Sequence, residues 1–426
     1  MDAKRHHYRN LRRIDKPRDG RARLQSHNRA FPSASSSSGG SVKKPIRILV
    51  LMLCACFASV ARGEQQACKF PPVWAEFHKH NMRRSNPCEK VLSVKNVAGL
   101  SLKWSYPLGE FAESSPAVAM GMVFVGGTNT LYALNAKTGA EVWSYPTGDT
   151  VYSSPAVSNG IVYFGSTDNN LYALNAHTGK LLWLYTAGDW VNSSPTVSNG
   201  VVYVGSNDGN VYALNASTGA KLWSHNTNGQ VGDSSPALAE GTVFIGGSYT
   251  VEALNAEKGT LLWSDALGDF LNSPAVVDGV VYVGSSFDSP FNEDALYALS
   301  GKTGDKLWTF APGNWVLSSA AEAKGVVYAG SYDGNLYALD AKTGKKLWSY
   351  LAGGYVIPSP AEANGVVYIA NDAGTLYALN AGTGAKLWES SFGAGSFASP
   401  VVADGMVYLP GYDYGDKGNL YAFALK

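Results

Sequence analysis

Three side chains with oxygen ligands occupy one position of a sequence that repeats about every forty residues. Glu113, Asn192 and Asp233 each stand three residues before the proline of a Ser-Pro pair. The same position of later repeats is apolar and holds Leu271, Leu317, Ile357 and Phe397. Two residues earlier, on the same side of an extended strand, several repeats carry an aromatic ring, including Trp190, Trp315 and Tyr355. The three polar residues and these three rings are our candidate binding residues, because small-molecule sites often join a few polar groups to an apolar wall.

Other patterns that could support catalysis or metal binding are weak. No G-x-S-x-G motif or Ser/His/Asp arrangement stands out among the many serines. His177 and His225 do not have the spacing of metal ligands, and we interpret them as surface residues. The Asp-Gly pairs, such as Asp208-Gly209, are expected to form hairpin turns rather than metal loops.

The elements that position these side chains are short strands. In residues 193–223, the runs 201–204 and 210–214 are rich in β-forming residues and flank the turn at Asp208-Gly209. Thr218-Gly219 turns the chain again before residues 221–223, and the Ser-Pro segment supplies one more strand. The tryptophans that end the units lie 39 or 40 residues apart, with one spacing of 45. Four strands per unit at this period predict an all-β propeller rather than a helical solenoid.

Counting the units predicts eight blades over residues 100–426. The eighth unit ends at Leu425 without a tryptophan strand, whereas residues 100–104 form such a strand before the first unit. We expect this N-terminal strand to complete the last blade, since pairing it there would close the ring and remove two exposed edges.

Residues 133–143 resemble the tryptophan-docking motif, A-x-[ND]-x-x-T-G-x-x-x-W, of quinoprotein dehydrogenases and other pyrroloquinoline quinone (PQQ)-like repeat proteins. The motif recurs intact in the units that end at Trp183, Trp223, Trp348 and Trp388, while Lys258 and Ser300 depart from it. The resemblance implies that the tryptophans dock between blades, at Trp104, Trp143, Trp183, Trp223, Trp263, Trp308, Trp348 and Trp388. The family contains both PQQ dehydrogenases and non-catalytic members. For an enzyme it implies PQQ with Ca²⁺, which the family holds through Glu, Asn and Asp side chains that come partly from B–C turns. Glu113, Asn192 and Asp233, near Trp190 or Trp315, have these ligand types but do not match the family's ligands residue by residue.

The predicted distribution of charge argues against a PQQ enzyme. In each blade, the A–B and C–D turns lie on one face, and the B–C turns and blade-to-blade connections lie on the other. The second face, which we call the acidic face, is predicted to carry Asp149, Asp168, Asp189, Asp208, Asp233, Asp269, Asp288, Glu293, Asp294, Asp333, Asp372, Asp413 and Asp416. Its clear cation is Lys417, and no arginine follows Arg84. PQQ is a tricarboxylate that would need cationic partners in a semi-dry cleft.

Charge and hydropathy also divide the chain along its length. Residues 1–63 hold 14 Lys+Arg against 3 Asp+Glu, which leaves residues 64–426 with a net charge of −10. An acidic body is unsuited to nucleic acid. Residues 42–63, with Lys43-Lys44, an apolar run and a small-residue exit, predict a signal peptide that is too short to span a bilayer. We interpret residues 1–41 as a disordered basic leader or an artefact of the gene model.

The four cysteines fit an exported chain. Cys54 and Cys56 would leave with the signal peptide, although residues 53–56 faintly resemble a lipoprotein box and leave a lipid anchor as the alternative. Cys68 and Cys88 are expected to form a disulfide in an N-terminal lead-in of residues 64–99.

The sequence therefore predicts a periplasmic or secreted, monomeric, non-catalytic scaffold. We expect it to bind a protein or a small ligand through the acidic face and to hold no cofactor. The alternatives are a PQQ- and calcium-dependent dehydrogenase, and a sensor that binds a small ligand or sugar at its aromatic rim.

Overall fold

The structure, a computed structural model, describes residues 74–77, 84–268, 271–285, 294–415 and 417–426. All of these residues belong to the compact unit Ser59–Lys426, which is distinct from the unit Met1–Ala58. The predicted leader, signal peptide and lead-in as far as residue 73 lie outside the described residues. The described part of the chain contains one short 3₁₀ helix, η1 (Val97–Gly99), and no helix there is long and apolar enough to cross a membrane.

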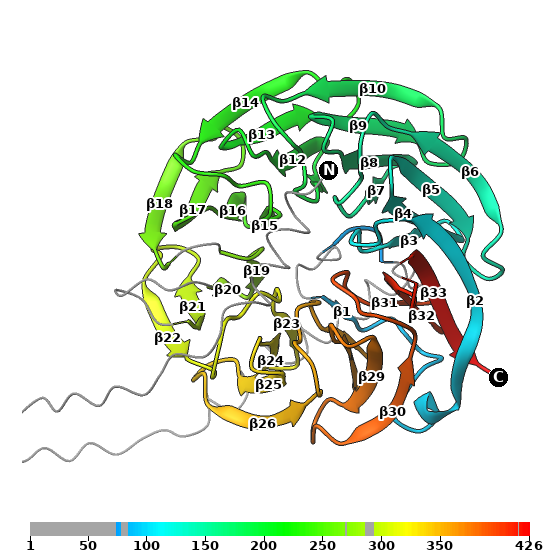
Figure 1. Cartoon of the computed structure of the whole chain (residues 1–426). Coiled ribbons are helices and arrows are strands. Elements are labelled where there is room, and N and C mark those ends of the chain that lie inside the picture. The colour runs from blue at the N-terminus through cyan, green and yellow to red at the C-terminus, as the bar shows by residue number, and fades with distance from the viewer. Residues whose placement is uncertain (1–73, 78–83, 269–270, 286–293, 416) are drawn as a thin grey trace, which may run out of the picture. The chain divides into compact units, whose positions relative to one another are not determined.

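Eight antiparallel blades form a ring, as predicted from the eight sequence units (Figure 1). We name the four strands of a blade A to D from the centre to the rim. Blades 1 to 4 consist of β3 (Ala117–Ala119), β4 (Met122–Gly127), β5 (Thr130–Asn135) and β6 (Glu141–Pro146); β7 (Ala156–Ser158), β8 (Ile161–Gly165), β9 (Asn170–Asn175) and β10 (Leu181–Thr186); β11 (Thr196–Ser198), β12 (Val201–Gly205), β13 (Asn210–Asn215) and β14 (Lys221–Asn226); β15 (Ala237–Ala239), β16 (Thr242–Gly246), β17 (Thr250–Asn255) and β18 (Leu261–Ala266).

The other four blades repeat this arrangement. Blades 5 to 8 consist of β19 (Ala275–Val277), β20 (Val280–Gly284), β21 (Leu296–Ser300) and β22 (Lys306–Phe310); β23 (Ala321–Ala323), β24 (Val326–Gly330), β25 (Asn335–Asp340) and β26 (Lys346–Leu351); β27 (Ala361–Ala363), β28 (Val366–Ala370), β29 (Thr375–Asn380) and β30 (Lys386–Ser391); β31 (Val401–Ala403), β32 (Met406–Tyr412), β33 (Gly418–Leu425) and β2 (Leu100–Gly109).

The predicted closing strand is confirmed. β2 pairs antiparallel with β33, and the register sets Leu100 against Leu425 and Trp104 against Ala422. The N-terminal strand therefore supplies the outer strand of blade 8. One strand lies outside the four-strand pattern, because β1 (Ser85–Asn86) pairs in parallel with β27 and widens the sheet of blade 7.

The hydrophobic core lies between neighbouring blades rather than within one layer. Phe124 of blade 1 belongs to the same buried cluster as Val162 of blade 2, and similar clusters join the blades that follow. Both faces of the middle strands are consequently buried, which explains their nearly continuous apolar runs.

Tryptophans of the outer strands reach across to the following blade. Trp183 Nε1 donates to Ala216 O at 2.9 Å, and Trp223 Nε1 donates to Ala256 O at 3.0 Å. A Cβ at Gly259 would lie only 2.5 Å from Trp223 Cε3, so the motif glycine supplies the space in which the indole packs. Trp143, Trp263, Trp308, Trp348 and Trp388 make the corresponding hydrogen bond.

Serines form a belt around the inner ends of the blades. The amide of each serine donates to the hydroxyl of the corresponding serine in the next blade, as from Ser115 to Ser154 at 3.0 Å. The described bonds continue through Ser194, Ser235 and Ser273, resume from Ser319 to Ser359 and Ser399, and return from Ser399 to Ser115 at 2.9 Å. The Ser-Pro segments thus join neighbouring blades side to side.

Candidate functional site

Part of the lead-in lies against the A strands of the ring. Trp74 exchanges two backbone hydrogen bonds with Val118 of β3, at 2.9 and 2.7 Å. Ala75 O accepts from the amide of Val157 on β7 at 2.7 Å. The lead-in therefore adds to the inner strands of blades 1 and 2, and β1 does the same on blade 7. Nothing in the repeat pattern predicted this position for it.

Arg84 anchors the lead-in to the propeller. Its side chain is fully buried, and the guanidinium donates to four backbone carbonyls, those of Phe77, Ser359, Pro360 and Pro400, at 2.6 to 3.5 Å. It also lies over the rings of Trp74 and Phe77, at 5.5 and 4.7 Å from their centroids. Burial lowers the pKa of Arg84 to about 9, so the group is still charged at neutral pH. The guanidinium therefore directs its N–H groups at the backbone of the protein.

Glu76 is a second ionisable group of the lead-in inside the propeller. It is 6% exposed, and its Oε2 accepts from the amide of Val197 at 3.3 Å. Burial raises the pKa of Glu76 to about 7, although the bond from Val197 opposes the shift. The group therefore changes charge near neutral pH.

This pKa predicts a pH-dependent stability. Between about pH 4.5 and 7 the folded chain holds the Glu76 proton that the unfolded chain has lost. The free energy of unfolding therefore falls as pH rises through this range. We expect a loss on the order of 3 kcal/mol relative to Glu76→Gln, which stays neutral. Urea unfolding of both proteins from pH 4 to 8 measures the difference. A constant difference across this range would contradict the assignment.

Glu113 and Asp233, two of the polar candidates, have different surroundings. Glu113 Oε1 accepts from the hydroxyl of Tyr412 at 3.2 Å, beside the edge-to-face rings of Phe111 and Tyr152. Asp233 is exposed in the connection between blades 3 and 4. Among the described residues, no group of three or more His, Cys, Asp or Glu side chains is arranged to hold a metal ion. Glu113 and Asp233 therefore belong to no such group within the described residues.

Asn192 differs from the rest of its column. The side chain is only 7% exposed, and neither Oδ1 nor Nδ2 has a hydrogen-bond partner in the described part of the chain. A buried amide in this state obtains its hydrogen bonds from water or from a ligand. Trp190 lies two residues before it and is half-buried.

Two of the three aromatic candidates, Trp315 and Tyr355, pack on the same ring. Trp315 and Tyr332 have ring centroids 5.1 Å apart, and Tyr332 stacks on Tyr355 at 4.4 Å with an interplanar angle of 19°. Tyr355 is 39% exposed and ends this row of rings at the surface. Tyr332, in the B–C turn of blade 6, is the member that sequence analysis missed. It lies on a different turn from the other two, and strand periodicity relates only residues of the same strand.

Several carboxylates of the acidic face have a structural role. Asp208 Oδ2 accepts from Gly188 N at 2.7 Å and from the Tyr212 hydroxyl at 2.6 Å, while Oδ1 accepts from Asn210 N at 2.9 Å. Asp168 and Asp333 repeat these contacts in blades 2 and 6. The pattern D-x-N-x-Y was visible in the sequence and could have indicated this role.

These contacts also set the charge of the turns. Burial disfavours the ionised form of Asp208, but hydrogen bonds from Tyr212, Asn210 and Gly188 outweigh it and lower its pKa. Asp333 has the same balance and a lowered pKa. Both carboxylates stay ionised, and they fasten a B–C turn to the preceding connection. The exposed acids of this face are others, such as Glu110, Asp149 and Asp233.

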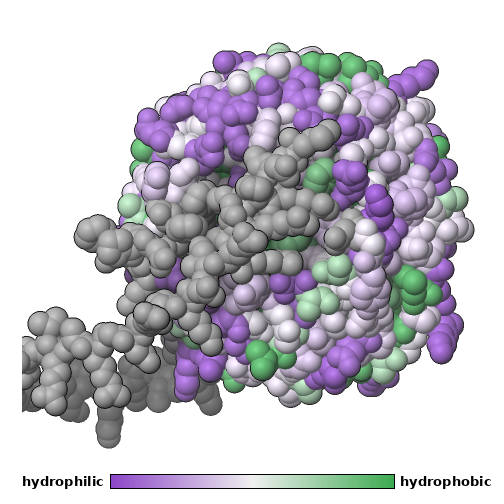
Figure 2. Space-filling model, viewed as in Figure 1, coloured by the Kyte–Doolittle hydropathy of each residue, from purple (hydrophilic) through white to green (hydrophobic). Residues whose placement is uncertain are grey.

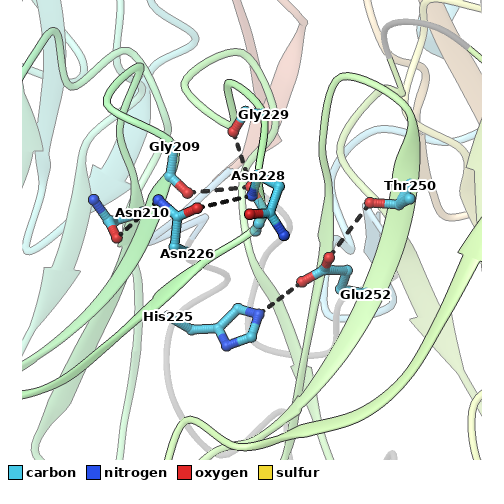
Figure 3. A network of polar contacts seen from close by, with 9 residues as sticks. Gly209, Asn210, His225, Asn226, Asn228, Gly229, Thr250 and Glu252 are labelled. Atoms are coloured by element: carbon cyan, nitrogen blue, oxygen red, sulfur yellow. Dashed lines mark hydrogen bonds and ion pairs between the residues drawn. The ribbon is translucent and has the colours of Figure 1, made fainter.

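His225 and Glu252 form an unusual contact between blades 3 and 4 (Figure 3). Nε2 of His225 lies 2.9 Å from Glu252 Oε2, and Thr250 contacts the other carboxylate oxygen at 3.4 Å. At the corresponding place other neighbouring blades pair two tyrosines, as in Tyr185 with Tyr212. His225, which we interpreted as a bland surface residue, is thus part of a blade interface.

Comparison with known proteins identifies the family. The family model described as outer membrane protein assembly factor BamB matches residues 96–153, 147–267, 248–356 and 351–426. The chain belongs to this PQQ-like repeat family. A search of curated proteins found no match.

Solved structures of dehydrogenases and of BamB share the fold. Quinohemoprotein alcohol dehydrogenase ADHIIG from Pseudomonas putida HK5 is 19% identical, with a TM-score of 0.70 over 84% of this chain and 81% of that chain. Europium-containing methanol dehydrogenase is 16% identical, with a TM-score of 0.68 over 85% and 100%. BamB from Moraxella catarrhalis is 21% identical, with a TM-score of 0.61 over 77% and 98%. At these identities the likeness shows the fold alone.

The described residues do not fit PQQ well. Its carboxylates require cationic donors in a dry site, yet Arg84, the one arginine among the described residues, directs its guanidinium at four backbone carbonyls. The described acidic face contributes Lys417, which is exposed in the B–C turn of blade 8. We therefore derive no catalytic step through this cofactor.

Proposed function

We propose that the chain is an exported, non-catalytic binding scaffold whose partner is a basic protein surface that meets the acidic face. The separation of charge between the two faces carries this proposal. The described B–C turns and blade connections contain exposed acids and the single Lys417, whereas the A–B and C–D turns contain exposed lysines such as Lys137, Lys180 and Lys342 together with acids such as Glu240. A surface of one sign attracts a partner of the other sign and orients it.

Two comparisons support the same proposal. The family model carries the description of an assembly factor, and one similar structure is BamB. In addition, Arg84, the one arginine among the described residues, donates to backbone carbonyls of the propeller. The export of the chain and its predicted Cys68–Cys88 disulfide remain part of the proposal; Cys88 is buried, and Cys68 lies outside the described residues.

Charge reversal on the acidic face tests the proposal. The double variant Glu110→Lys/Asp149→Lys changes two exposed acids of this face and avoids the carboxylates that hold its turns. We expect about tenfold weaker binding of a fluorescent oligolysine probe at low salt, because each exposed charge contributes a fraction of a kcal/mol and is reversed in sign. Fluorescence anisotropy gives the dissociation constant.

The matched control makes the same change in charge on the opposite face. Glu240→Lys/Glu257→Lys alters two exposed residues in the A–B and C–D turns of blade 4 and is expected to retain most of the affinity. Equal losses in both double variants would show that only net charge matters and would overturn the proposal. A saturable rise in melting temperature with PQQ and Ca²⁺, lost in Glu113→Ala, would instead support a quinoprotein dehydrogenase.

A further inference from the structure

The outer strand of blade 2 is more apolar than the outer strands of the other blades. β10 reads Leu181-Leu182-Trp183-Leu184-Tyr185-Thr186 and has no charged residue. Each of the other seven outer strands contains at least one charged side chain, as Lys221 in β14 and Glu141 in β6. A charge on an edge strand discourages pairing with another molecule, so β10 lacks a protection that the other blades have.

Leu184 is the clearest departure from the repeat. The residue that follows the docking tryptophan is polar in every other outer strand, namely Ser105, Ser144, Ser224, Ser264, Thr309, Ser349 and Glu389. In β10 it is a leucine that is 47% exposed, and Leu182, which points to the same side of the strand, is 48% exposed. Leu181 adds a third apolar side chain at 42% exposure. Burial within the propeller does not account for these leucines.

The strand is also available as an edge. β10 is the last strand in the sheet order of blade 2, and within the described residues it pairs only with β9. Figure 2 shows a hydrophobic patch on the upper rim, where Figure 1 places β10. An exposed, uncharged, apolar edge is suited to pairing with another strand.

We propose that β10 is a self-association edge, at which two copies of this chain pair antiparallel about a two-fold axis. A two-fold axis brings the same strand of both copies together. The charges at its ends are complementary in that orientation, because exposed Lys180 precedes β10 and Asp189 follows it. Antiparallel pairing brings the lysine end of one copy toward the aspartate end of the other.

The side chains fit the same arrangement. With the two-fold axis near Leu184, the two copies of Leu184 lie against each other, and Leu182 of each copy lies against Thr186 of the other, on one face of the joined sheets. Such cross-strand apolar pairs stabilise a sheet, and like charges placed directly opposite destabilise it. The substitution Leu184→Lys would place one lysine of each copy directly opposite the other across the axis. The two like charges would repel and weaken the dimer.

Sedimentation equilibrium of the full chain, from low micromolar to submillimolar concentration, tests this inference. We expect a reversible monomer–dimer equilibrium for the unmodified protein. Leu184→Lys should weaken it at least about tenfold, because the two cations face each other across the axis. The matched control is Ser224→Lys, which puts the same side chain at the equivalent position of β14 and should leave the dimer unchanged. Circular dichroism and melting temperature verify that both variants fold.

Each alternative result is informative. A chain that stays monomeric throughout the range would overturn the inference, as would a dimer that survives Leu184→Lys. Equal weakening by Ser224→Lys would point to a general effect of charge on the rim. Capture of a foreign apolar strand peptide by a chain that remains monomeric would overturn the self-pairing and assign the edge to another protein. The acidic-face proposal is unaffected by any of these results.

Discussion

Replacing Arg84 with methionine is expected to lower the free energy of unfolding by about 4 kcal/mol, which corresponds to a fall of about 6 °C in melting temperature for a domain of this size. Methionine retains much of the apolar volume that packs on Trp74 and Phe77, but it cannot donate hydrogen bonds. The carbonyls of Phe77, Pro360 and Pro400 would lose a charged donor inside the protein, and each unsatisfied buried group is costly. Calorimetry at neutral pH measures the change.

Two further variants separate the causes of this loss. Lys103→Met removes an equal charge from the exposed surface of β2 and should change stability little. Arg84→Lys keeps the charge but cannot reach four carbonyls at once, so we expect an intermediate effect. If Arg84→Met and Lys103→Met melted at the same temperature, the anchoring role of Arg84 would be wrong.

Trp223→Ala should cost a similar amount, about 4 kcal/mol, through a different mechanism. The indole is 9% exposed, packs tilted against Tyr203 at a centroid distance of 5.9 Å, and donates to Ala256 O in the next blade. Its removal leaves a cavity between blades 3 and 4 and an unpaired carbonyl. Denaturant unfolding gives the free energy, and Leu222→Ala on the same strand, 52% exposed, is the control that should change little.

The same docking contact can be tested from the other side. Gly259 has a positive φ of 68° and faces the indole of Trp223, and a Cβ there would lie 2.5 Å from the ring. Gly259→Ala should therefore also destabilise the chain, by strain and crowding rather than by a cavity. A neutral effect of both Trp223→Ala and Gly259→Ala would refute the docking role that the motif implies.

The fold was predictable because its signals are local and repeated. The spacing of the tryptophans, the Asp-Gly turn at 208–209 and the missing eighth tryptophan strand were sufficient for eight blades and for the closing role of β2. Each rests on turn and strand chemistry within about forty residues. The lead-in does not repeat, so its position along β3, β7 and β27 was beyond such reasoning.

The candidate site was predictable only in part, for a geometric reason. Trp315 and Tyr355 share a column and lie close together, but Tyr332, which joins them, comes from a turn whose position depends on the packed ring. The sequence marked Asp208 as an acid of the face, whereas the structure shows its carboxylate occupied by Gly188, Asn210 and Tyr212. A charge counted in the sequence is therefore not automatically a charge available to a partner.

The pairing of β2 with β33 has a consequence for the order in which the protein is made. Leu100 finds its partner at Leu425, almost at the end of the chain. During synthesis the intermediate blades can form from local contacts, but β2 has no partner until the last residues have appeared, so closing the ring is a late event. Until then both open edges are exposed to other strands. A chain that is cut short near its C-terminus would retain seven complete repeats and still lack its closing contact.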